Sequence, residues 1–233
     1  MLQLDHLRLR QTGFALDADW SLPKGSRLAV IGPSGAGKSS LLMAIAGFLA
    51  PVQGHIRWEG AEFTTLPPAG RPVSILFQDQ NLFPHLTLVQ NLGLALSPRL
   101  KLDAAQRRRI DQVLDRLGLA GLGQRRPGDI SGGQQGRAAL GRVLLQARPL
   151  LLLDEPFAAL GPALKADLLS LVKEMATEAG TTVLLVTHNP QDARSFADLT
   201  VVVADGIATA PAQTLVLLAD PPPALAAYLG PDG

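Results

Sequence analysis

The sequence predicts an α/β domain that begins with an antiparallel β subdomain and contains an inserted α-helical subdomain. Three observations lead to this fold class. Apolar and polar residues alternate over the first 22 residues, as in strands with one buried face. Two short runs, 150–153 and 182–187, have no polar face, as expected of strands buried in a parallel sheet. The stretch from 82 to 147 shows helical patterns and no convincing strand, and 233 residues suffice for one such domain.

The first elements are expected to be antiparallel strands. Their apolar positions are Leu2, Leu4, Leu7 and Leu9 in the first strand and Phe14, Leu16, Trp20 and Leu22 in the second. A signal peptide would instead need an unbroken apolar run, so we do not expect export. The most apolar stretch, "LLMAIAGFLAPV", is shorter than the roughly 20 residues that cross a bilayer.

A strand, a glycine-rich loop and a helix follow. The run Leu28–Ile31 stops at "GPSGAGKSS", which fits the G-x-x-x-x-G-K-[ST] pattern of a phosphate-binding loop. Backbone N–H groups would converge on the phosphates, Lys38 would reach the β- and γ-phosphates, and Ser39 would ligate Mg²⁺. A glycine-rich turn without chemistry is disfavoured, because the lysine and the hydroxyl follow in the required order. The expected nucleotide-binding residues are Gly32, Pro33, Ser34, Gly35, Ala36, Gly37, Lys38, Ser39 and Ser40.

The middle of the chain is expected to be a helical lobe. Asp103 can cap a helix that ends at Gly118 and whose apolar residues share one face. The basic run "QRRRI" on this helix fits a solvated outer face better than a binding patch. Further on, "ISGGQQ" begins another helix, where Ser131 can act as the cap and Gly132 and Gly133 leave N–H groups exposed to an anion. Such a site could serve the same phosphates from a second copy of the chain, whereas an ordinary helix cap is the alternative.

Acidic residues follow the buried run at 150–153. In "LLLLDEP", Asp154 would hold Mg²⁺ through its water shell and Glu155 would polarise the attacking water, the alternative being a turn cap. His188 ends the run "TVLLVTH", and ligands bind where parallel strands end. Gln78 also ends a strand-like run, in "ILFQDQN", and could touch the nucleophile or the metal-bound water.

The last elements are a crossover and a hairpin. Pro162 opens a helix that Gly180 closes, which completes a βαβ crossover. The stretch "TVVVADGIA" predicts a hairpin with an Asp-Gly turn. The tail beyond Pro211 is rich in Ala, Pro and Leu and predicts nothing definite.

Charge and cysteine content exclude some chemistry. The chain has 21 Lys plus Arg against 20 Asp plus Glu, so no net field holds a nucleic-acid backbone and we expect no nucleic-acid partner. There is no cysteine, which excludes disulfides, thiolate metal sites and thiol nucleophiles.

In this order, the motifs resemble those of the ATP-binding subunit of an ABC transporter. "GPSGAGKSS" is similar to Walker A, "LLLLDEP" to Walker B and "ISGGQQ" to the signature motif. Gln78 matches the Q-loop glutamine and His188 the switch histidine. The resemblance implies a P-loop NTPase (RecA-like) core and a homodimer that closes on two Mg-ATP molecules. It implies catalytic roles for Glu155, His188 and Gln78, metal ligation by Ser39, Gln78 and Asp154, and ATP contacts from Ser131, Gly132, Gly133 and Gln134 of the other copy.

The resemblance also implies a domain plan. The whole chain, 1–233, would be one ATP-binding domain. Residues 1–80 and 148–210 would form the nucleotide-binding core, 81–147 the helical lobe with the signature motif, and 211–233 the tail.

A narrower resemblance lies in the stretch 67–106, which is similar to ATP-binding subunits of bacterial thiamine importers. It implies a peripheral ATP hydrolase on the cytoplasmic face of the inner membrane, bound to permease subunits and served indirectly by a periplasmic solute-binding protein. Subunits of iron, sulfate or polyamine importers share the general motifs but usually run longer. A soluble ABC-type ATPase acting on nucleic acid or ribosomes usually adds coiled coils or a second ATPase half, and a nucleotide kinase leaves "ISGGQQ" unexplained.

The sequence departs from the family pattern at three places. Gly161 replaces an acidic residue that helps link the two ATP sites, so weaker coupling is expected. The aromatic residue that stacks on adenine is matched by Gln11, or by Phe14 if the register shifts. Gly136 and Gly141 stand where the family carries side chains and are each expected to cost roughly 0.5 to 1 kcal/mol of helix stability.

Overall fold

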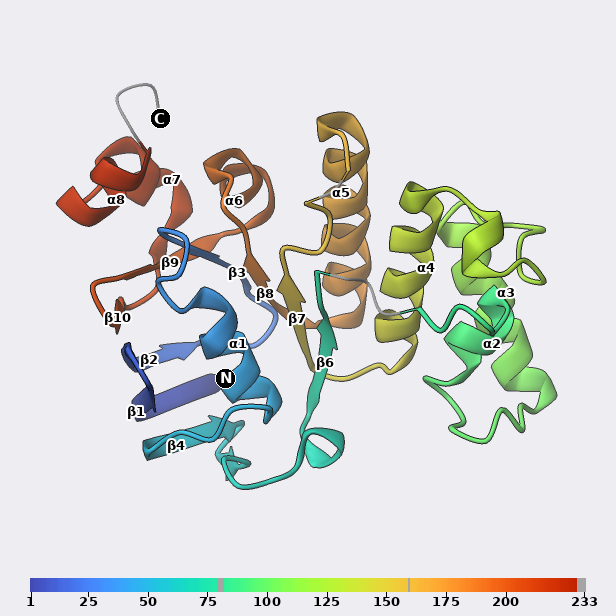
Figure 1. Ribbon diagram of the computed structural model, residues 1–233, viewed down its shortest axis with the longest axis horizontal. Coiled ribbons are helices and arrows are strands. Elements are labelled where there is room, and N and C mark those ends of the chain that lie inside the picture. The colour runs from blue at the N-terminus through green and yellow to red at the C-terminus, as the bar shows by residue number, and fades with distance from the viewer. Residues whose placement is uncertain (79–81, 159, 230–233) are drawn as a thin grey trace. The chain divides into compact units, whose positions relative to one another are not determined.

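The computed structural model describes residues 1–78, 82–158 and 160–229 (Figure 1). The chain divides into two compact units. The first comprises Met1–Val73, Pro149–Glu155 and Leu169–Gly233, and the second comprises Ser74–Arg148 and Pro156–Leu168. The domain plan inferred from the sequence, with a lobe at 81–147, stays a prediction.

The first unit is built on a mixed β-sheet. Its strands lie in the order β5-β4-β1-β2-β10-β9-β3-β8-β7, with β11 paired to β9. Their bounds are β1 Leu2–Gln11, β2 Phe14–Leu22, β3 Arg27–Ile31, β4 Gln53–Trp58, β5 Ala61–Glu62, β7 Leu150–Asp154, β8 Thr182–Val186, β9 Leu199–Ala204, β10 Ile207–Ala208 and β11 Ala212–Gln213.

The N-terminal strands are antiparallel, as predicted. In β1 and β2, Leu4 pairs with Trp20 and Leu9 with Leu16, and these four side chains are buried. The pairs β3–β9, β3–β8 and β7–β8 are parallel, and the apolar runs of these four strands are buried. The predicted hairpin is also present, since β9 pairs antiparallel to β10 across Asp205 and Gly206, both with positive φ. Parallel pairing brings the carboxyl ends of β3, β7 and β8 to one edge of the sheet.

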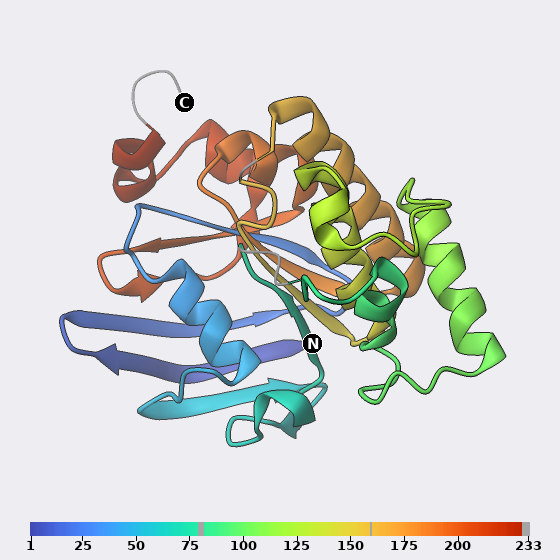
Figure 2. The ribbon, with the colours of Figure 1, turned by 45° about the vertical axis from the view of Figure 1, so that its right-hand side comes forward.

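Helix α1, Lys38–Ala46, follows β3 directly and packs against β1 and β7. Figure 2 shows it, in light blue, crossing in front of the N-terminal strands. Arg71 holds the end of this helix: its guanidinium donates to the carbonyl oxygens of Ala44 and Ile45, in the last turn, and to those of Thr64 and Leu66. These bonds satisfy carbonyls that a helix end leaves unpaired.

The remaining helices of the first unit follow β8 and β11. They are α6 Pro190–Phe196, α7 Thr214–Ala219 and α8 Pro223–Leu229, and a short 3₁₀ helix, η1, spans Pro68–Gly70. Helix α5, Pro162–Ala179, begins and ends where the sequence predicts, and its residues from Leu169 onward belong to the first unit. Within the described ranges, no helix combines the length and the apolar character needed to cross a membrane.

The second unit is helical beyond the strand β6, Val73–Leu76. Its elements are α2 Leu88–Gly93, α3 Ala104–Arg116, η2 Pro127–Asp129 and α4 Gly132–Leu145. The predicted cap of α3 is confirmed, because the side chain of Asp103 accepts a hydrogen bond from the N–H of Gln106, and the side-chain oxygen of Gln106 accepts one from the N–H of Asp103.

Close packing against α3 explains why α4 has a glycine at position 141. A Cβ atom added to Gly141 would lie 2.6 Å from a methyl carbon of Leu117 and 3.1 Å from one of Val113. Ile110, Leu114 and Leu117 of the α3 segment are buried, so α3 and α4 approach closely at this point. Gly141 therefore lowers the helix propensity of α4 but allows α3 to pack closely, a requirement that the sequence did not reveal.

Candidate functional site

The phosphate-binding loop joins β3 to α1, and two of its glycines are required by geometry. Gly32 has a φ of 145°, and a Cβ atom there would lie 2.1 Å from the carbonyl oxygen of Val203. Gly37 caps α1 with a φ of 106°, in the left-handed region that side chains disfavour. The loop therefore ends at the N-terminus of a helix, where free N–H groups and the helix dipole favour an anion.

Lys38 lies inside this loop and is only 7% exposed. Its ammonium group donates to the carbonyl oxygens of Gly32 and Pro33, each at 2.8 Å. Burial lowers the pKa of Lys38, and the carboxylates of Glu155 and Asp154 act in the opposite direction. The ammonium group is thus held beside the loop with two carboxylates close enough to affect its charge.

Asp154, at the end of β7, faces the start of α1. The hydroxyl of Ser39 donates to Oδ1 of Asp154 at 2.9 Å. Burial raises the pKa of Asp154, the negative charge of Glu155 raises it further, and Ser39 and Lys38 lower it. A hydroxyl and a carboxylate that adjoin in this way are the hard oxygen ligands that Mg²⁺ takes, so the residues fit the predicted metal site.

Glu155 and His188 meet at the carboxyl ends of β7 and β8. Oε2 of Glu155 lies 2.9 Å from Nδ1 of His188, and the two side chains are 24% and 57% exposed. Glu155 has a φ of 45°, in the left-handed region, and its N–H donates to the carbonyl oxygen of Val186. A glutamate held in that region stores backbone strain, a feature that concentrates at functional sites.

The predicted second anion site belongs to the second unit. The hydroxyl of Ser131 caps α4 by accepting from the N–H of Gln134, and the side-chain oxygen of Gln134 accepts from the N–H of Ser131. A Cβ atom on Gly132 would meet nothing within 4 Å, whereas one on Gly133 would lie 2.5 Å from Leu164. The helix start has the predicted cap, and its ATP contacts in a dimer stay a prediction. Gln78 is an exposed turn residue after β6, and its role likewise stays a prediction.

Phe14, rather than Gln11, lies beside the phosphate loop. A Cβ atom on Gly37 would lie 2.4 Å from the Phe14 ring, so the ring covers the glycine at the start of α1. Gln11 pairs with Phe14 across the β1–β2 turn and is exposed.

Two further residues near the site were missed in the sequence. The hydroxyl of Tyr228, on α8, donates to the carbonyl oxygen of His188, and Arg71 holds the end of α1. Both interactions join a side chain to a distant backbone carbonyl, for which the sequence offers no periodic signal. The one available sign is that Tyr228 is the single tyrosine of the chain and stands in a tail rich in Ala and Pro.

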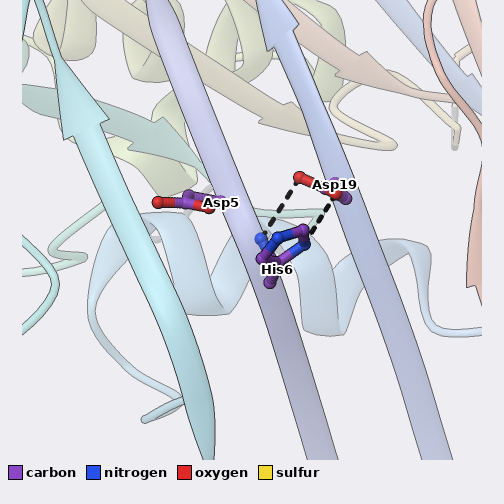
Figure 3. Close-up of side chains that lie close together, drawn as sticks. All are labelled: Asp5, His6 and Asp19. Carbon is purple, nitrogen blue, oxygen red and sulfur yellow. Dashed lines mark hydrogen bonds and ion pairs between the residues drawn. The ribbon is translucent and has the colours of Figure 1, made fainter.

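A separate titratable cluster lies on the N-terminal strands. Asp5, His6 and Asp19 bring their ligand atoms within 4.8 Å of one another. Figure 3 shows His6 turned toward Asp19, with Asp5 directed to the other side. His6 Nδ1 lies 2.7 Å from Asp19, and Arg57 donates to Asp5 at 2.6 Å, which holds the pKa of Asp5 below its usual value. These are partly exposed ion pairs, which contribute little to stability.

The fold and the first-unit site define a P-loop nucleotide-binding ATPase of the ABC class. The chain belongs to the ABC transporter family, whose model matches residues 16–158, and the predicted resemblance is confirmed. Two solved structures support the fold, each 26% identical to this chain: a nucleotide-free ATP-binding cassette from an ABC transporter, with a TM-score of 0.86 over 99% of both chains, and a dimeric cassette bound to ADP and Pi, with a TM-score of 0.79 over 92% of this chain and 99% of the other.

Among its relatives, the chain is similar to thiamine import ATP-binding proteins named ThiQ. That of Cereibacter sphaeroides is 65% identical over 231 residues, covering 99% of this chain and all of the relative. That of Ruegeria sp. (strain TM1040) is 53% identical over 99% of this chain and all of the relative. The protein of Escherichia coli (strain K12) is 49% identical over 80% of each chain.

Proposed function

We propose that this chain is the ATP-hydrolysing subunit of a bacterial thiamine importer. The observation that supports thiamine as the solute is the full-length similarity to proteins named for thiamine import, at 65% identity in one case. Iron, sulfate and polyamine importers are the alternatives within the family, and nothing in the described residues favours them. The ABC family membership also disfavours a nucleotide kinase.

The phosphate loop would bind ATP. Lys38 would exchange the carbonyl oxygens of Gly32 and Pro33 for phosphate oxygens, because its ammonium already lies within the loop. Ser39 and Asp154 would hold Mg²⁺, and the ion would neutralise charge on the phosphates. Phe14, beside Gly37, is the aromatic residue we assign to the adenine.

Glu155 would act as general base and His188 would orient it. Their 2.9 Å contact keeps the carboxylate at the edge where the phosphate loop lies, and both belong to the same compact unit. A carboxylate accepts a proton from water when it is held within hydrogen-bond reach. Nearby Lys38 supplies a compensating positive charge.

Dimerisation would complete the site. The start of α4, from Ser131 to Gln134, would face the phosphates bound by the other copy, with Gly132 free of steric obstruction. A dimeric relative bound to ADP and Pi supports the two-copy arrangement. The dimer would dock on transmembrane permease subunits at the cytoplasmic face of the inner membrane, with a periplasmic protein delivering the solute.

Uptake of labelled thiamine tests this proposal. Cells lacking the chain would be complemented with the native sequence or with Glu155→Gln. Uptake restored by the native chain alone supports both the solute and the hydrolytic role. Uptake that the deletion leaves unchanged would refute the thiamine assignment, and the same assay with iron, sulfate and polyamines would then identify the solute.

A further inference from the structure

The C-terminal helix contributes a hydrogen bond to the loop that carries His188. Helix α8, Pro223–Leu229, holds Tyr228, whose hydroxyl donates to the carbonyl oxygen of His188, forty residues earlier in the chain. Both residues belong to the first unit. The tail therefore reaches the backbone of a residue that we assign to hydrolysis.

Helix α8 is anchored, so it presents the tyrosine from a fixed position. Leu225 is fully buried, and α8 packs on β9. The N–H groups of Leu225 and Ala226 both donate to the carbonyl oxygen of Pro222, at 2.8 and 2.9 Å. Figure 1 shows α8 beside α7, close to the C-terminal end of the described chain. Tyr228 is thus a side chain on a packed helix and not part of a free end.

The loop around His188 is braced on either side of the histidine. The N–H of Thr187 donates to Val30, and its hydroxyl donates to the buried carboxylate of Asp192. The N–H of Asn189 in turn donates to the Thr187 hydroxyl at 3.1 Å. The bond from Tyr228 adds a constraint on the peptide group that joins His188 to Asn189. Because rotation of that peptide would turn the histidine, the constraint also bears on the imidazole facing Glu155.

The tyrosine keeps its proton near neutral pH. Burial raises the pKa of Tyr228, and the negative charge of Glu155 raises it further. The phenol is therefore a permanent hydrogen-bond donor at physiological pH. His188 is the common partner, since its carbonyl oxygen accepts from Tyr228 and its ring contacts Glu155.

We infer that Tyr228 is a positioning residue for the pair formed by His188 and Glu155, so that helix α8 helps to set the rate of ATP hydrolysis. The inference rests on the proposed hydrolytic function of that pair. Tyr228 acts through the backbone of His188 and has no assigned contact with ATP. Its loss should therefore change the chemical step and leave nucleotide binding intact.

The test is Tyr228→Phe in the full chain, which keeps the ring and removes the donor. Steady-state ATP hydrolysis would be measured with Mg-ATP, and kcat calculated per bound nucleotide so that unfolded protein does not count. We expect kcat to fall about two- to tenfold, the effect of one hydrogen bond, with KM for ATP unchanged. Ala227→Ser is the matched control, because Ala227 is exposed on the same helix; it should retain native values.

The outcomes separate the inference from the proposal beneath it. If the native chain hydrolyses ATP and Tyr228→Phe has the same kcat, the tyrosine has no positioning role and the proposed function stands. A Tyr228→Phe variant that unfolds at a lower temperature but keeps the native kcat would also overturn the inference, because the hydrogen bond would then contribute to stability alone. A native chain that hydrolyses no ATP, alone or with its permease, overturns the proposed function itself.

Discussion

Nδ1 of His188 lies 2.9 Å from Oε2 of Glu155, and the two residues follow adjacent parallel strands. Because a carboxylate can only accept, this contact requires a proton on Nδ1. The other ring nitrogen is left free to face solvent or a ligand, and 57% of the histidine side chain is exposed. The arrangement fixes one carboxylate oxygen of Glu155.

Glu155→Gln should abolish turnover while ATP binding survives. The amide keeps the shape of the side chain but cannot accept a proton from water, and loss of a general base typically lowers the rate by about 10²- to 10⁴-fold. ATP hydrolysis and nucleotide binding would be measured on the same preparation. Light scattering with Mg-ATP should show a trapped dimer. Glu59→Gln, at an exposed glutamate paired with Lys24, is the control; a variant that turns over normally, or stays monomeric even with the permease, would contradict the assignment.

Lys38→Ala should weaken ATP binding. The lysine would exchange its two hydrogen bonds inside the loop for bonds to phosphate oxygens, and a charge-assisted bond contributes about 1.5 to 3 kcal/mol, so affinity should fall roughly 10- to 100-fold. Calorimetric titration with ATP measures the change. Lys24→Ala removes an exposed lysine of the same unit and should bind ATP as the native chain does. Equal affinity in the two variants would show that the phosphate loop is wrongly assigned.

Asp154→Asn should stabilise the free protein while destroying hydrolysis. Burial raises the pKa of Asp154 in the folded state above its usual value, so the folded state binds this proton more tightly than the unfolded state. The carboxyl therefore costs stability as the pH rises from about 4 through the raised pKa. Asparagine can still accept from Ser39 and carries no charge.

Thermal unfolding without nucleotide checks this prediction. The midpoint of the variant should exceed that of the native chain by a few degrees at pH 7, since each kcal/mol corresponds to about 2–4 °C for a domain of this size. The difference should shrink toward pH 4. A variant that is less stable than the native chain at pH 7 would show that the carboxylate is well compensated in the free protein.

Local patterns were sufficient to predict much of this structure. The alternation of apolar and polar residues predicted β1 and β2, and the capping residue Asp103 predicted the start of α3. Both patterns involve residues that are close in the sequence. The residues of the phosphate loop, with Asp154 and Glu155, could be chosen by type and order alone. Their roles in ATP chemistry stay predictions.

Long-range contacts to backbone could not be predicted. The hydroxyl of Tyr228 donates to the carbonyl oxygen of His188. The guanidinium of Arg71 donates to carbonyl oxygens of α1 and to that of Thr64, which lies between α1 and Arg71 in the chain. Any residue offers such an acceptor, so the partner leaves no mark in the sequence. The tail has no clear periodicity, and its two short helices, α7 and α8, were not predicted for the same reason.

Arg71→Lys should destabilise the first unit although the charge is kept. A lysine cannot reach the four carbonyl oxygens that the buried guanidinium contacts, and each carbonyl left unpaired costs about 1–3 kcal/mol. We expect a loss of about 2–4 kcal/mol in urea unfolding. Arg8→Lys, at an exposed arginine, should stay within about 0.5 kcal/mol of the native value. Equal stability of the two variants would mean that water replaces the guanidinium at the end of α1.

Gly141→Ala should destabilise the second unit, although alanine is the better helix former. Propensity alone would stabilise α4 by about 0.5–1 kcal/mol. The added methyl would lie 2.6 Å from Leu117 and 3.1 Å from Val113, and such overpacking typically costs about 1–3 kcal/mol, so the net change should be unfavourable. Gly132→Ala is the matched control in the same helix, because a Cβ atom there meets nothing within 4 Å, and it should be neutral or stabilising in urea unfolding. If both variants gain stability, helix propensity outweighs packing at Gly141 and the close approach of α3 to α4 is not needed.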